Sequence, residues 1–256
     1  SNTYVASEVI HYNDPLAEEG KTPTGAKLDV NEIRSSSVLS KVLDRMGLAG
    51  TYSVDNLISR GIEPWMCLCY GNPVYTPLAV PVFGAVGCPP IFTEEEKAAW
   101  ANYVRVLVAR YRSRVNYFEI WNEPDLDADN SDHKRCWGGT KLQFFELYDI
   151  AATHLKKCFP HLKIGGPALA GNLEWAEDFL KQLKAPLDFF SWHIYASEPL
   201  RLGEKARKVR EMLDKYGFEK SESILNEWNY VRGWVGDDWL YSLRSEKSIK
   251  GAAFIA

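Results

Sequence analysis

The sequence has no run of roughly eighteen consecutive apolar residues, so no segment of it could span a bilayer as a helix. Its first residues, Ser1-Asn2-Thr3, also lack the basic and apolar regions of a secretory signal. We therefore expect a soluble protein, and both the cytoplasm and secretion after removal of a signal fit this expectation.

Cysteine is scarce, and histidine forms no zinc motif. The five cysteines are an odd number without C-x-x-C spacing, which disfavours both a disulfide framework and a zinc ribbon. The five histidines form neither the H-x-H nor the H-E-x-x-H arrangement of metal-dependent hydrolases. The sequence also lacks the nucleophile elbow G-x-S-x-G and a G-x-G-x-x-G loop after a strand. We therefore predict no metal site, and no cofactor is implied.

Positive charge is thinly spread as well. The formal net charge is -4, and no dense Lys/Arg stripe interleaved with aromatic residues is present that could neutralise a phosphate backbone. Nucleic acid is therefore not an expected partner.

Aromatic side chains, in contrast, are abundant. They make up 13% of the residues, including nine Trp and thirteen Tyr, and can fill a core or present flat apolar faces to ligands such as sugar rings. The length of 256 residues fits one (β/α)8 barrel of about 250 residues, although two smaller domains would fit it equally well.

The order of elements favours the barrel. From Glu63 onward, short apolar runs alternate with amphipathic helical stretches, which is typical of βα units that build a parallel sheet. Near-continuous hydrophobicity indicates strands that are covered on both faces. The expected strands are Pro64 to Tyr70, Tyr117 to Trp121, Leu162 to Ala168, Leu187 to Tyr195 and Ser223 to Trp228.

Three helices are expected between these strands. The first, Thr93 to Tyr111, begins with a capping box made by Thr93 and Glu96. The others are Thr140 to Cys158 and Leu202 to Tyr216, each with apolar residues at helical spacing on one face. Most of the aromatic residues in these helices are predicted to lie in the core.

Both ends of the sequence fit a complete barrel poorly. Val38 to Met46 and Val54 to Ile62 resemble two helices, and Gly47 to Ser53 between them is too short for a core strand. After Trp228 too few residues remain for a helix and a further βα unit of about 30 residues. We therefore predict a single α/β barrel domain over residues 1–256 that lacks segments near both ends, with a chain break near Gly50. Its first strands and its eighth strand stay unassigned.

The strongest local motif runs from Phe118 to Asp125, where an apolar strand ends in Asn122, Glu123 and Pro124. The active site of a barrel lies at the carboxyl ends of its strands. Pro124 lacks a backbone donor and ends the strand, which leaves Glu123 at that position. Taken alone, the same residues could form a plain polar turn.

A second motif, Ile224 to Asn229, also delivers a carboxylate, Glu227, at the end of an apolar strand. Glu123 and Glu227 are roughly 100 residues apart, or about three βα units, so that both side chains can face one cleft. Two carboxyl groups about 5 Å apart carry out retaining glycoside hydrolysis, in which one protonates the leaving oxygen and the other attacks the anomeric carbon.

These residues resemble the clan A glycoside hydrolases, and most closely glycoside hydrolase family 39, which contains β-xylosidases and α-L-iduronidases. The resemblance covers roughly Gly61 to Trp228. The matching motifs, in family order, are Arg60-Gly61-Ile62-Glu63-Pro64-Trp65, Tyr70-Gly71-Asn72-Pro73, Ile120 to Asp125, Lys163-Ile164-Gly165-Gly166-Pro167-Ala168, Ser191-Trp192-His193-Ile194-Tyr195 and Asn226-Glu227-Trp228-Asn229.

The resemblance implies a role for each catalytic carboxylate. Glu123 maps onto the general acid/base and Glu227 onto the nucleophile, while Asn122 maps onto the residue that binds the sugar 2-hydroxyl. Such a hydrogen bond can strengthen as oxocarbenium character develops. The family's C-terminal β-sandwich is not recognisable in this sequence.

His193 and Tyr195 are two residues apart on an expected strand, so both can point toward the mouth of the barrel. By resemblance, we expect His193 to contact substrate or a carboxylate, and Tyr195 to donate its hydroxyl to Glu227. A lone His in an apolar strand is otherwise most often a core residue. Trp228, by the same resemblance, would line the sugar subsite.

Tyr70 and Asn72 end an expected strand and are further candidates for sugar-hydroxyl contacts, although Asn-Pro is also a common turn pair. Trp137, Trp234 and Trp239 lie in loop-like stretches, where they either wall the cleft or pack beneath loops.

The sequence thus predicts a retaining, β-xylosidase-like glycoside hydrolase that acts on an oligosaccharide or glycoside. Two alternatives stay open, which are a non-catalytic carbohydrate-binding barrel and a clan A glycosidase of other sugar specificity. The oligomeric state is not predicted.

Overall fold

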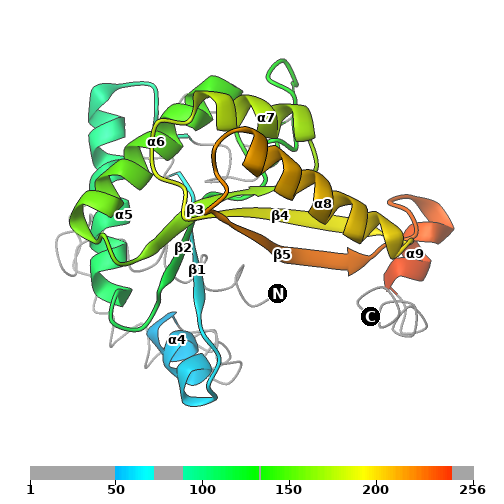
Figure 1. The fold of residues 1–256 in the computed structure, drawn as a ribbon, viewed down its shortest axis with the longest axis horizontal. Coiled ribbons are helices and arrows are strands. Elements are labelled where there is room, and N and C mark those ends of the chain that lie inside the picture. The colour runs from blue at the N-terminus through cyan, green and yellow to red at the C-terminus, as the bar shows by residue number, and fades with distance from the viewer. Residues whose placement is uncertain (1–49, 72–88, 133, 244–256) are drawn as a thin grey trace, which may run out of the picture.

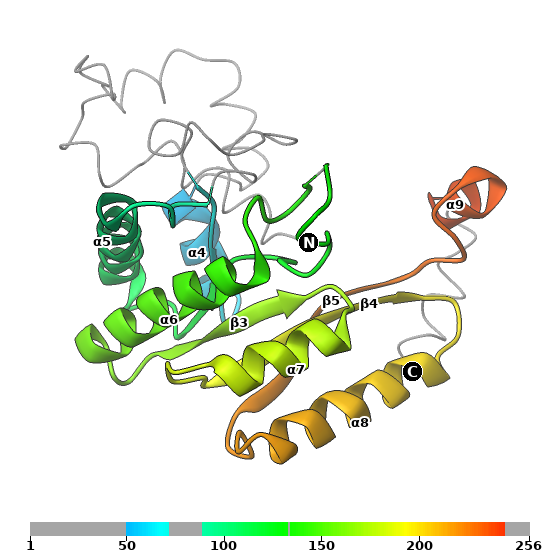
Figure 2. The same cartoon turned by 90° about the horizontal axis from the view of Figure 1, so that it is seen from above.

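The computed structural model describes residues 50–71, 89–132 and 134–243. Its centre is a parallel sheet of five strands in the order β1-β2-β3-β4-β5, which curves as part of a (β/α)8 barrel (Figures 1 and 2). The strands are β1 (Trp65–Leu68), β2 (Tyr117–Ile120), β3 (Lys163–Leu169), β4 (Phe189–Ala196) and β5 (Glu222–Tyr230). All five coincide with the expected strands, so the α/β barrel class is confirmed as a five-stranded portion.

Helices connect successive strands and lie along the outside of the sheet (Figure 2). They are α5 (Glu94–Tyr111), α6 (Lys141–Cys158), α7 (Leu173–Gln182) and α8 (Leu200–Lys215), with α4 (Gly50–Ser59) before β1 and α9 (Gly236–Leu243) after β5. Within the described ranges, none of these helices combines the length and apolar character needed to cross a membrane.

The helix starts follow from local side-chain chemistry. Thr93 caps α5 by accepting the backbone N–H of Glu96, whose side chain bonds back to the cap residue, as the capping box predicts. Thr140 and Gln143 make the same arrangement at the start of α6. The predicted apolar face of α5, which includes Trp100 and Val104, is buried against the core.

The start of the described chain bears on the helix predicted from Val54 to Ile62. This helix is present as α4, which already includes Gly50 and ends before Ile62. The predicted break near Gly50 stays a prediction. The helix predicted over Val38 to Met46 lies outside the described residues. So do residues 244–256, the last part of the segment in which we left the eighth strand unassigned.

Two elements that were not predicted also surround the site. α7 begins at the N-cap Asn172, whose side chain accepts the N–H of Trp175, and α9 follows β5 in a stretch that we expected to be a loop.

On β3, the backbone approaches β4 so closely that a Cβ added to Gly165 would meet the carbonyl oxygen of Phe189 at 2.2 Å. Only glycine fits there, which allows β3 and β4 to lie side by side.

Candidate active site

Glu123 follows β2 at the carboxyl-terminal edge of the sheet, which is the edge where the strands end. Its backbone has φ 47°, a left-handed conformation that is uncommon for a residue with a side chain. The Glu123 N–H donates to the carbonyl oxygen of Ala168 at the end of β3, with an N···O distance of 3.0 Å. The loop after β2 is thereby attached to the neighbouring strand.

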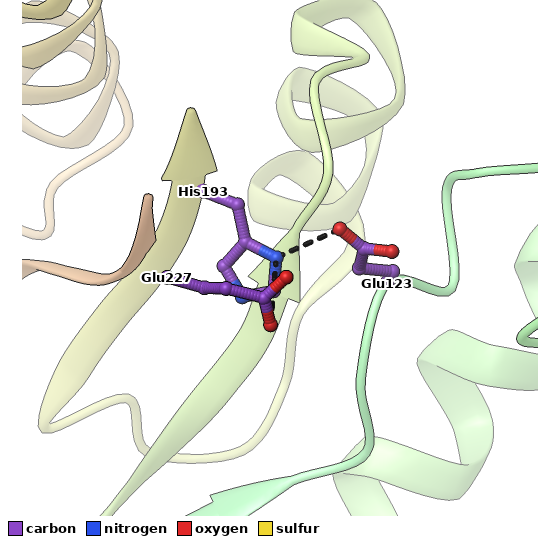
Figure 3. Close-up of side chains that lie close together, drawn as sticks. All are labelled: Glu123, His193 and Glu227. Atoms are coloured by element: carbon purple, nitrogen blue, oxygen red, sulfur yellow. Dashed lines mark hydrogen bonds and ion pairs between the residues drawn. The ribbon is translucent and has the colours of Figure 1, made fainter. Parts of the chain in front are cut away.

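His193, on β4, lies between the two glutamates (Figure 3). Its Nδ1 atom is 2.8 Å from Oε1 of Glu123 and 3.7 Å from Oε2 of Glu227. Burial lowers the pKa of His193, but the hydrogen bond with Glu123 and the charges of Glu227, Glu123 and Glu119 outweigh it, so the pKa is raised above its ordinary value. The imidazole is only 1% exposed and makes the carboxylate contact that the sequence predicts.

Glu227 is brought beside His193 by an irregularity in the sheet. Trp192 pairs with Leu225, whereas the next residue of β4, His193, pairs with Glu227. Asn226 is therefore the extra residue of a β-bulge, a feature that re-aims side chains near active sites. Without it, the register would place Asn226 opposite the histidine.

Two further contacts define Glu227. The hydroxyl of Tyr195 donates to its Oε1, which is the contact that the sequence predicts. A carboxylate oxygen of Glu123, a ring nitrogen of His193 and a carboxylate oxygen of Glu227 all lie within 4.8 Å of one another. Glu123, Glu227, His193 and Tyr195 thus form one cluster, made from the loop after β2 and from the strands β4 and β5.

The other predicted site residues are less closely tied to this cluster. Asn122 is buried beside Glu123, and Trp228 next to Glu227 is 39% exposed. The ring of Tyr70 packs edge-on against Trp121 at a centroid distance of 5.4 Å. Asn72 lies outside the described residues.

A cavity of about 570 Å³ opens over Glu123 and Glu227. Its wall includes Trp234, which is 60% exposed and packs edge-on against Tyr195 at 5.4 Å, while Trp239 stacks on Trp234 at 5.5 Å. Of the three tryptophans left open by the sequence, Trp234 therefore lines the cavity. Trp137 is instead buried in the core.

Asp125 and Arg135 also line this cavity, although neither was predicted as a site residue. Arg135 is held by Asp127, which accepts from its Nε at 2.9 Å. Asp125 directly follows the Asn-Glu-Pro motif, and this position in the sequence could have indicated that it lies near the site.

Glu119, on β2, is a third carboxyl group near the cluster and was also not predicted. It is 2% exposed and accepts from Nδ2 of Asn226 at 2.8 and 3.0 Å. Burial raises its pKa, against smaller lowering effects from the Ser191 hydroxyl and the His193 charge. The bulge that aligns Glu227 with His193 thus lies beside a partly buried hydrogen bond between Asn226 and Glu119.

Two other kinds of chemistry can be weighed at the cluster. Cys136 lies with Sγ 4.0 Å from Oε2 of Glu123, but burial, together with the nearby Glu123 charge, raises its pKa to about 12, so the thiol stays neutral. Glu123, His193 and Glu227 also offer donor atoms of the types that a divalent ion takes. The sequence predicts no metal site. Treatment with a chelator would distinguish a metal-dependent cluster, which would lose activity, from a metal-free one, which would not.

Comparison with known proteins places this geometry in a family. A family model described as glycosyl hydrolases family 39 matches residues 85–228. A beta-xylosidase from Caldicellulosiruptor saccharolyticus is 29% identical over 183 residues, 63% of this chain and 36% of the relative. A beta-xylosidase from Geobacillus stearothermophilus is 34% identical over 147 residues, 53% of this chain and 27% of the relative.

Solved structures show the same fold. The match to the crystal structure of a glucosidase from Croceicoccus marinus covers 79% of this chain and 40% of the glucosidase chain, at 26% identity and with a TM-score of 0.57. The match to a monomeric beta-xylosidase from Caulobacter crescentus covers 82% of this chain and 43% of the xylosidase chain, at 24% identity and with the same TM-score. This chain spans only about a third of the length of the curated relatives that it matches.

Proposed function

The chain belongs to glycosyl hydrolases family 39, and on that premise we propose that it is a retaining glycoside hydrolase with Glu123 as general acid/base and Glu227 as nucleophile. The observation that carries the proposal is the distance between the two carboxylates. One oxygen of each carboxylate lies within 4.8 Å of an oxygen of the other, which fits the separation of about 5–5.5 Å between the carboxyl groups of a retaining pair better than the about 6.5–9.5 Å of an inverting pair.

In the first step, a carboxylate oxygen of Glu227 attacks the anomeric carbon. The bond from that carbon to the leaving oxygen breaks, and Glu123 donates its proton to the leaving oxygen. In the second step, water attacks the anomeric carbon of the glycosyl ester while Glu123 accepts a proton from the water, and Glu227 leaves as a carboxylate. Both residues end in their starting states.

The neighbouring groups support this division of roles. The Tyr195 hydroxyl donates to Oε1 of Glu227, and a hydrogen bond to the charged form of a carboxylate favours that form. His193 contacts Glu123 at 2.8 Å and orients it toward the side of the cleft that holds Glu227.

The substrate is proposed from the cavity and from the relatives. Trp234 lines the cavity and is exposed, and Trp228, which follows Glu227 on β5, is also exposed; flat aromatic faces of this kind suit sugar rings. Asn122 is proposed to bind the sugar 2-hydroxyl. Because the two relatives named above are called beta-xylosidases, a β-xyloside is the first substrate to test, followed by β-glucoside, β-galactoside and α-iduronide.

A mechanism-based label tests the proposal. An activated 2-fluoro β-xyloside should form a stable ester on Glu227, which peptide mapping would identify. The Glu222→Gln variant, changed on the same strand at its other end, should still be labelled. A label on any other residue would overturn the assignment. A metal-dependent mechanism at the same cluster would require activity to fall with a chelator, whereas the proposed mechanism requires no change.

A further inference from the structure

Asp125 makes an unusual set of contacts two residues after Glu123. Its carboxylate accepts three successive backbone N–H groups, from Ala170, Gly171 and Asn172, each at 2.8 Å. These donors belong to the loop between β3 and α7. Asp125 is 7% exposed, so its carboxylate joins the loop after β2 to the loop after β3 in a mostly dry environment.

Lys205, on α8, holds the other side of the same loop. Its Nζ donates to the carbonyl oxygen of Ala170 at 3.1 Å and to that of His193 at 2.6 Å. Burial lowers the pKa of Lys205, against the charges of Asp125 and Glu123. The peptide unit between Ala170 and Gly171 therefore lies between a cation on its C=O and an anion on its N–H. We call this arrangement the Asp125–Lys205 clasp.

The clasp connects the elements that carry the acid/base and its histidine. Glu123 has an unfavourable φ of 47°, and a backbone in such a region persists only when its surroundings hold it. The direct backbone bond is from Glu123 N–H to Ala168 O, two residues before the loop that Asp125 holds. Lys205 fixes the same loop to the backbone of His193, which contacts Glu123.

We propose that Asp125 is a positioning residue for the general acid/base, acting through the Asp125–Lys205 clasp rather than on the sugar. The inference rests on the proposed role of Glu123. Both carboxylate oxygens of Asp125 are engaged by backbone donors, which favours a positioning role over a substrate contact although the residue lines the cavity. Glu227 lies farther from His193, at 3.7 Å, and its hydrogen bond comes from Tyr195 while its backbone belongs to β5.

This separation predicts a specific kinetic signature. Loss of the clasp should impair protonation of the leaving oxygen and spare nucleophilic attack. A leaving group that departs without protonation, such as 2,4-dinitrophenolate, does not need the acid. A poor leaving group, such as phenolate, does need it. The defect should therefore grow as the pKa of the leaving phenol rises.

The test is Asp125→Asn, measured as kcat/KM with a series of aryl β-xylosides from 2,4-dinitrophenyl to phenyl. Asparagine keeps one oxygen that can accept a backbone N–H, but it lacks the negative charge. Its NH2 group would face backbone N–H groups, which cannot accept a hydrogen bond. We expect a fall on the order of 10²-fold for the phenyl glycoside, because general acid catalysis contributes about 10²- to 10⁴-fold, and a change within about threefold for the dinitrophenyl glycoside.

Asp149→Asn is the matched control. Asp149 also accepts two backbone N–H groups, from Lys184 at 3.0 Å and from Ala185 at 2.8 Å, but it lies on α6, away from the cluster. Its loss should affect every substrate of the series equally. A second variant, Lys205→Met, removes the cation from the other side of the clasp and should steepen the leaving-group dependence in the same direction. It decides the question if Asp125→Asn does not fold.

Glu123→Ala separates failure of the inference from failure of the proposed function. If Glu123→Ala shows a steep leaving-group dependence and both clasp variants show an equal loss for all substrates or only a raised KM, the positioning role is wrong. If Glu123→Ala itself shows no such dependence, the acid/base assignment fails.

Discussion

Acidic side chains have different partners at the two edges of the sheet. At the amino-terminal edge, Glu222 pairs with Lys163 at 2.8 Å and Asp188 pairs with Lys156 at 2.8 Å. At the carboxyl-terminal edge, two glutamates contact the same imidazole, at 2.8 Å and 3.7 Å. At one edge each acid thus has its own cation, whereas at the other two carboxyl groups lie close together around one histidine.

We interpret this difference as a division of roles, in which one edge serves the stability of the fold and the other serves the proposed reaction. In barrels, residues at the amino-terminal face serve mainly stability, whereas the catalytic groups lie at the carboxyl-terminal face. Perturbed and crowded ionisable groups are typical of functional sites, where activity is maintained at a cost in stability. Substitutions at the two edges should therefore affect different measurements.

The largest effect should come from Glu227→Gln, which removes the proposed nucleophile. We expect kcat to fall on the order of 10⁴-fold or more, while the melting temperature stays equal or rises because a half-buried charge is removed from a crowded site. Steady-state kinetics and calorimetry on the same preparation check both parts. A variant that loses activity only because it unfolds would remove the contrast between the two edges.

Tyr195→Phe should have the next largest effect. The variant keeps the ring against Trp234 but removes the hydroxyl that donates to Glu227. A hydrogen bond to a charged group contributes about 1.5–3 kcal/mol, which corresponds to a fall in kcat/KM of about 10- to 100-fold. Equal kinetics for the variant and the original protein would show that the hydroxyl does not support the nucleophile.

His193→Gln should reveal a pH-dependent contribution to stability. Because the folded pKa of His193 is raised, the protonated imidazole stabilises the fold fully below its unfolded pKa of about 6.5, and this contribution is lost as the pH rises through the folded pKa. The difference in unfolding free energy between the variant and the original protein should be largest near pH 5.5 and shrink by pH 9. Denaturant titrations at both pH values measure it, and a difference that grows with pH would contradict the pKa direction.

At the amino-terminal edge, Glu222→Gln should give the smallest effect. It weakens the pair with Lys163 and a bond from the Tyr117 hydroxyl at 3.0 Å, and the side chains of the ion pair are 38% and 43% exposed. Exposed ion pairs contribute about 0–1 kcal/mol, so we expect a loss of this size in unfolding free energy and activity within about twofold. A large loss of activity without a loss of stability would show that the edges are not separate in function.

Local patterns in the sequence predicted the parts of the site that depend on a single strand. Apolar runs that end in Glu123 and Glu227 placed both residues at strand ends, and the spacing of His193 and Tyr195 placed them on one face. Capping chemistry at Thr93 placed the start of α5. The spacing of the two glutamates, about three βα units, allowed both to face one cleft, and the resemblance to a known family then supplied their separate roles.

The parts that were missed depend on contacts between distant segments. The clasp joins Asp125 to residues 45 or more positions away, and no local pattern marks such a contact. The bulge at Asn226 depends on the register between β4 and β5, which a single strand does not reveal.

The most direct test of the catalytic pair is the configuration of the first-formed sugar. Proton NMR during hydrolysis of an aryl β-xyloside follows the anomeric signals before mutarotation mixes them. A pair of carboxylates within 4.8 Å predicts that the β-anomer appears first, because two displacements retain the configuration. If the α-anomer appears first, Glu227 is not the nucleophile and acts instead as a base through a water molecule.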